Sequence, residues 1–120
     1  MVHELLSGTY DLHIHTAPDV IPRKCTDEET VRRLEAAGMK GCAIKCHYFE
    51  TAARAALLQE RFPQMIIVGG LVLNRSVGGI NPEAWSGSDR WAAECSGFPP
   101  WTPVRFSSIR KKRHKCRLIF

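Results

Sequence analysis

Two histidines stand two residues apart in residues 10–16, which read Tyr-Asp-Leu-His-Ile-His-Thr. Apolar and polar residues alternate here, so a β-strand would carry Asp11, His13 and His15 on one face. Imidazole is the usual nitrogen ligand of zinc and similar divalent ions, and neighbouring imidazoles on one strand face can reach a common point. Asp11 could add an oxygen ligand or orient a histidine. The pattern predicts a metal site, and the alternative is a pair of solvated or hydrogen-bonded histidines.

Two later apolar runs also end in polar residues: Lys45 and His47 close one of them, and Asn74 and Arg75 follow the other. The carboxyl ends of parallel strands gather the functional groups of α/β proteins, so we expect these side chains beside the first histidine pair. His47 is then a third candidate metal ligand, with a plain surface histidine as the alternative. Lys45, Asn74 and Arg75 are candidate site-lining or substrate-binding residues, and Lys45 could instead be an ordinary solvated lysine. No residue is assigned as the catalytic base.

Alternating strands and helices must position these residues. Strands are expected at 9–15, 41–47 and 65–73, with helices at 26–38 and 51–62. Thr26 and Glu29 form a capping box at the first helix start, and Gly38 is placed to end that helix in a left-handed conformation. Strand, helix and strand joined by short connections predict parallel βαβ units. Asn81 and Pro82 resemble a helix start, but the residues after them lack helical periodicity, so no helix is expected there.

The chain length sets a limit on this α/β fold. With 120 residues, the chain is far shorter than the roughly 250 residues of a complete eight-stranded barrel. We therefore expect a partial (β/α) barrel of about three parallel units. Its open edges would expose apolar surface, which predicts self-association.

Cysteine usage and hydropathy bear on the compartment. The five cysteines are irregularly spaced, which favours a reducing compartment, and we expect a cytoplasmic protein. Cys42 and Cys46 lack a second pair at zinc-site spacing and are expected to be core thiols. No apolar run approaches the roughly 18 residues of a membrane-spanning helix, so no membrane partner is expected.

Composition changes near residue 84. Residues 1–84 hold nine Lys and Arg against ten Asp and Glu, whereas residues 85–120 hold eight against two and all three Trp. We expect the barrel portion at 1–84 and an irregular or disordered basic tail at 85–120, which a shifted reading frame could have produced. The basic cluster at 110–115 could contact nucleic acid, but no recognisable binding fold carries it, so a solvated tail is expected instead.

The segment Asp-Leu-His-Ile-His-Thr at 11–16 resembles the opening of the amidohydrolase superfamily of metal-dependent hydrolases, and equally that of the PHP-type phosphoesterases. The longer match at 11–19, with the segments at 45–47 and 73–82, is similar to a little-characterised amidohydrolase-like branch. Both families are distorted (β/α) barrels. The later ligands and the catalytic aspartate of amidohydrolases have no counterpart here, and Lys45 lies on the wrong strand for the bridging lysine.

The resemblance implies a metal-dependent hydrolase acting on an amide, ester or related bond of a small molecule through metal-activated water. Zinc is the first choice of cofactor, with manganese or iron as alternatives. The missing residues predict a truncated form of low activity. The alternatives are a PHP-like phosphoesterase fragment and a non-catalytic fragment whose basic tail contacts nucleic acid.

Overall fold

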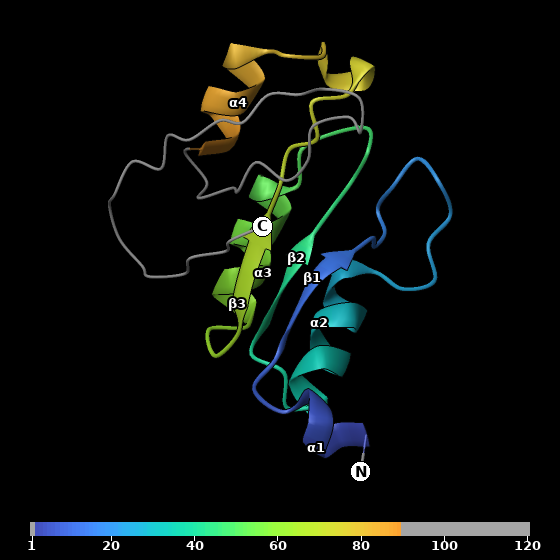
Figure 1. The fold of residues 1–120 in the computed structure, drawn as a ribbon, viewed down its shortest axis with the longest axis vertical. Helices are drawn as coiled ribbons and strands as arrows, with labels where there is room; N and C mark the ends of the chain where they lie inside the picture. The colour runs from blue at the N-terminus through green and yellow to red at the C-terminus, as the bar shows by residue number, and fades with distance from the viewer. Residues whose placement is uncertain (1, 90–120) are drawn as a thin grey trace.

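The computed structural model describes residues 2–89, which form a three-stranded parallel sheet with helices along one face (Figure 1). The strand order is β1-β2-β3. The elements in chain order are α1 (Val2–Leu6), β1 (Tyr10–Ile14), α2 (Asp27–Ala36), β2 (Gly41–Ile44), α3 (Ala52–Arg61), β3 (Ile66–Gly69), the 3₁₀ turn η1 (Arg75–Val77) and α4 (Pro82–Asp89). The expected parallel α/β arrangement is confirmed, with strands two to five residues shorter than predicted.

The core lies between the sheet and the two central helices. Val31 of α2, Leu58 of α3 and Ile44 of β2 all belong to one buried cluster. Cys42 is also buried there, and burial, followed by the charges of Asp11 and Asp27, raises the pKa of its thiol to about 12. Its predicted role as a core thiol is therefore confirmed.

The start of α2 follows the predicted capping box. The Glu29 amide donates to the Thr26 hydroxyl at 3.2 Å, and the Thr26 amide donates to the Glu29 carboxylate at 2.8 Å. These hydrogen bonds hold the pKa of the Glu29 carboxyl below its usual value. At the other end, Gly38 follows the helix with φ +77°, a left-handed conformation that favours glycine. Both helix-end predictions are confirmed.

A buried threonine fastens the carboxyl ends of β2 and β3 to the start of α3. Thr51 is fully buried, and its hydroxyl donates to the Ile44 carbonyl at 2.6 Å while accepting from the Gly70 amide at 2.8 Å. Gly69 permits this close approach, because a Cβ at that position would lie 2.4 Å from the Thr51 carbonyl oxygen. The strand ends that carry the polar residues are thus held in fixed register.

A β-bulge interrupts β1. Asp11 pairs with Cys42 and Ile14 pairs with Ile44, so the pairing slips by one residue between the two positions. Paired residues of neighbouring parallel strands point to the same side of the sheet, and both partners on β2 belong to the core under the helices. Asp11 and Ile14 therefore share the helix side of the sheet.

A helix follows Asn81, although the sequence predicted none there. α4 forms at Pro82–Asp89, across the composition change at residue 84. The Asn81 side chain accepts hydrogen bonds from the amides of Glu83 and Ala84, at 3.1 and 3.2 Å, as a helix cap does. Ala84 and Ser88 lie one turn apart on the buried side of α4, and this packing outweighs a segment rich in Ser and Gly.

The remaining tail expectations, including the basic cluster at 110–115, lie outside the described residues. Within residues 2–89, no helix is both long enough and apolar enough to span a bilayer.

Replacing Thr51 by Val should lower the free energy of unfolding by about 1–3 kcal/mol, because the Ile44 carbonyl and the Gly70 amide would be left buried without a partner. Thr51→Ser keeps the hydroxyl and is the matched control, with a much smaller loss. Urea unfolding of both variants measures the difference. A Val variant as stable as the parent chain would contradict the role given to this hydroxyl.

Candidate metal centre

Three imidazoles meet at the carboxyl end of the sheet. The ring centroids of His13 and His15 lie 5.2 Å apart, and those of His15 and His47 lie 5.0 Å apart, with the latter two rings stacked. His15 follows the end of β1 and His47 follows the end of β2. The predicted proximity of the three histidines is therefore confirmed.

His15 is the central member of this cluster. Its Nδ1 is buried and has no hydrogen-bond partner among the described residues. Burial, followed by the positive charge of Arg23 and the neighbouring imidazoles, lowers the pKa of His15, while a hydrogen bond with the Lys45 backbone acts in the opposite direction. The lowered pKa favours the neutral form of His15, in which the buried nitrogen can offer a lone pair to a cation.

The ligand set for a metal ion is incomplete in this part of the chain. Within residues 2–89, no group of three or more His, Cys, Asp or Glu side chains has the geometry to hold a metal ion. A catalytic zinc ion normally takes three protein ligands and keeps one position open. The imidazoles therefore have the chemistry of zinc ligands, but further donors or a closer approach of the rings would be needed to complete a site.

Asp11 does not share the face of the two imidazoles. The bulge in β1 places Asp11 with Ile14 on the helix side, and the histidines on either side of Ile14 point the other way. The Asp11 carboxylate instead accepts a hydrogen bond from the His13 amide at 3.0 Å. The prediction that Asp11 shares a face with the two imidazoles assumed unbroken alternation along the strand, and it is wrong. Asp11 instead holds the backbone at His13 through this hydrogen bond.

The residues after β3 support the loop that carries His47. The Asn74 side-chain amide and the Ser76 hydroxyl each donate to the His47 carbonyl oxygen at 3.0 Å. Asn74 is thus occupied with positioning this loop. Arg75 is exposed at the start of η1. Lys45 is half-buried, and its amide donates to the Ile14 carbonyl at 2.8 Å, which joins β1 to the chain just beyond β2.

An ion pair that sequence reasoning missed lies in the loop after β1. The side chain of Asp19 is fully buried and accepts a hydrogen bond from Arg23 Nε at 2.6 Å. Its other oxygen accepts from the Val20 amide at 2.7 Å and from the Cys46 thiol at 3.3 Å. Cys46 precedes His47, so this carboxylate fastens the loop to the histidine cluster. The spacing of Asp19 and Arg23 on an irregular loop gave no periodic signal that could have revealed the pair.

The balance of forces on Asp19 favours its charged form. Burial alone would raise the pKa of this carboxyl, but the hydrogen bonds from Arg23, Cys46 and Val20 outweigh burial and hold the pKa below its ordinary value. Cys46 was expected to be a core thiol. It is buried, but it donates to a carboxylate at the candidate site and lies outside the main core cluster.

A second, half-buried ion pair anchors the base of the same loop. Arg54 of α3 makes two hydrogen bonds to the Asp27 carboxylate, from Nε at 2.8 Å and from Nη2 at 2.7 Å. The same carboxylate accepts from the Thr16 hydroxyl. Thr16 directly follows His15, so this pair holds the end of the histidine strand against both helices.

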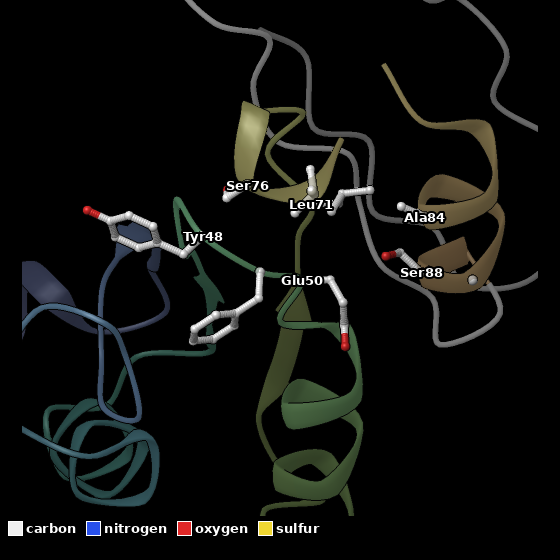
Figure 2. Close-up of a pocket in the computed structure, with 9 residues that line it drawn as sticks. Tyr48, Glu50, Leu71, Ser76, Ala84 and Ser88 are labelled. Atoms are coloured by element: carbon white, nitrogen blue, oxygen red, sulfur yellow. The ribbon is translucent and has the colours of Figure 1, made fainter. Parts of the chain in front are cut away.

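A cleft of about 470 Å³ opens beyond the strand ends, mostly apolar in its lining. Figure 2 shows Ala84 and Ser88 on α4 facing Glu50 and Leu71 across it, with Tyr48 on the side of the first two strands. The Ser88 hydroxyl is buried and has no hydrogen-bond partner among the described residues. Ser76 also lines the cleft while it holds the His47 carbonyl, so the cleft borders the loop of the candidate site.

Asp19→Asn should lower the free energy of unfolding by about 1.5–3 kcal/mol at pH 7, because a buried charge-assisted hydrogen bond is weakened. A lowered carboxyl pKa contributes stability above the unfolded value near pH 4, and this contribution disappears as the pH falls through the folded value. The difference between the two proteins should therefore shrink below about pH 4.

Urea unfolding of both proteins at a series of pH values measures this difference. The control is Glu60→Gln, which changes an exposed carboxylate on α3 and should leave the pH profile unaltered. A constant difference between the Asp19→Asn variant and the parent chain from pH 7 to pH 3 would contradict the role assigned to this carboxylate.

Comparisons with known proteins place the chain in a family. One family model matches residues 8–115, and its description is a family of unknown function, DUF6282. No curated protein and no solved structure matches the chain. The matched range continues past the composition change at residue 84, and the shifted reading frame stays a prediction that sequencing of the gene would test. Because the match covers well over half of its length, the chain belongs to the DUF6282 family.

Proposed function

We propose that this protein is a metal-dependent hydrolase of the amidohydrolase type, acting on an amide, ester or related bond of a small molecule. His13, His15 and His47 would supply nitrogen ligands to a divalent ion, with zinc as the first choice and manganese or iron as alternatives. One observation carries the proposal: three imidazoles converge at the carboxyl end of a parallel sheet, around a buried His15 nitrogen that has no partner within the described residues.

The side chains around the cluster suit such a site. A divalent ion held there would lower the pKa of a bound water and polarise the scissile group. The lowered pKa of His15 favours its neutral form, so a metal ion would meet less competition from protons for the lone pair. The Asp19 and Asp27 contacts hold the two chain segments that carry the histidines, which limits the reorganisation needed to bring the rings onto one ion.

The remaining parts of the site would come from outside residues 2–89. We propose that the three parallel strands are the first units of a (β/α) barrel, whose later strands would add the ligands and the catalytic aspartate that the resemblance implies. The cleft beside His47 would then hold part of the substrate. We also propose a cytoplasmic protein, since Cys25, Cys42 and Cys46 are all free thiols.

Metal binding by the full chain is the first test of this proposal. Titration with cobalt, followed by the visible absorption of the bound ion, should give a binding curve that zinc reverses. His15→Gln and His13→Gln should each weaken binding by at least about tenfold, because each removes a nitrogen ligand. His3→Gln is the matched control, since α1 lies at the opposite end of the sheet (Figure 1).

Turnover is measured on the same metal-loaded samples with amide, ester and phosphoester substrates. Because the catalytic aspartate has no counterpart here, we expect only slow hydrolysis of the amides or esters, which is lost in His15→Gln and kept in His3→Gln. Equal metal affinity in the parent chain and both cluster variants would contradict the proposed site. Hydrolysis of phosphoesters alone would favour the alternative that the protein is a PHP-like phosphoesterase.

A further inference from the structure

We propose that Arg23 forms an oxyanion subsite beside the histidine cluster, and that the substrate carries a carboxylate or phosphate group which its guanidinium binds. That the bound molecule is a substrate rests on the proposed function. Anion binding itself is measurable on the metal-free chain, so the subsite and the hydrolase activity can fail separately.

The guanidinium of Arg23 is held by the protein through its Nε, and its terminal nitrogens remain for a ligand. Its Nε donates to the Asp19 carboxylate at 2.6 Å, and the side chain is 19% exposed. Among the hydrogen bonds of the described residues, Arg23 donates only through Nε, which leaves its two terminal nitrogens for a ligand. Arginine presents five N–H donors in a rigid fork, so the terminal nitrogens can bind an oxyanion in bidentate fashion while Nε stays on the protein.

A chain of contacts places Arg23 at the histidine cluster. Its partner Asp19 also accepts from the Cys46 thiol at 3.3 Å, and the next residue in the chain is His47. Asp19 therefore links Arg23 to the residue that precedes His47.

The surroundings of Arg23 favour a subsite over a purely structural ion pair. Asp19 also accepts hydrogen bonds from the Val20 amide and the Cys46 thiol, so its carboxylate does not need the terminal nitrogens of Arg23. Arg75, one of the candidate substrate-binding residues, is instead exposed on η1. Arg23 is the better-positioned of the two, because its side chain is preorganised by a buried partner and loses little freedom on binding.

The test uses inorganic phosphate and acetate as probes, titrated separately into the metal-free full chain at constant pH and ionic strength. The arginine Nε–H and histidine ring signals are followed by NMR to obtain dissociation constants. Arg23→Lys, which keeps a charge beside Asp19, should weaken binding, and Arg23→Gln should weaken it by at least about tenfold. Arg75→Gln is the matched control and should bind as the parent chain does.

The Arg23→Gln variant would leave the Asp19 carboxylate without its ion pair, so the double variant Asp19→Asn with Arg23→Gln provides a folded comparison, checked by circular dichroism. Binding that is lost in this double variant and in Arg23→Gln, with perturbed His15 signals in the parent chain, supports the subsite. Preference for phosphate would indicate a phosphorylated substrate, and preference for acetate a carboxylate. Unchanged affinity in the Arg23 variants, or no binding by the parent chain, would overturn the proposal.

Discussion

The arrangement of the candidate site depends on the buried Thr51 hydroxyl. A parallel sheet gathers functional groups only if its strand ends stay aligned, and short strands of four or five residues have few ladder hydrogen bonds to fix that alignment. Thr51 supplies the constraint by joining the ends of β2 and β3 to the first turn of α3. Because the hydroxyl is fully buried, neither partner can exchange it for water without opening the core. The loops that follow β2 and β3 therefore start from fixed points, and Asn74 and Ser76 can reach the His47 carbonyl.

Much of the architecture was predictable from sequence because the signals are local. The alternation of apolar runs with amphipathic segments, the capping box at Thr26 and the glycine at position 38 each depend on neighbouring residues alone. Proximity of the three histidines followed from topology, since parallel strands bring their carboxyl ends to one edge. The helix α4 was missed although Asn81 and Pro82 were recognised as a helix start, because its packing, which sequence periodicity did not show, outweighs the weak intrinsic propensity of the residues after them.

The parts of the site that sequence could not give depend on pairings between distant residues. The bulge that separates Asp11 from the imidazole face arises in the register between β1 and β2, and strict alternation along one strand cannot reveal it. The contact of Cys46 with Asp19 spans 27 positions, as does the pair of Arg54 with Asp27. Contacts between residues so far apart in the chain leave no periodic pattern in the sequence. They fix the loop after β1 at two points, one beside His15 and the other beside His47.

Arg23 and a divalent cation carry like charges, so their proximity at the histidine cluster has an electrostatic cost. The buried Asp19 carboxylate reduces that cost, because it lies against the guanidinium and keeps its charge. Arg23 also disfavours protonation of His15, which keeps the imidazole in the form that can act as a ligand. An anionic group lying between the arginine and a bound ion would be attracted to both, and would turn the repulsion between them into favourable contacts. In the proposed site, an anion bound by Arg23 would therefore offset the repulsion between the guanidinium and the cation.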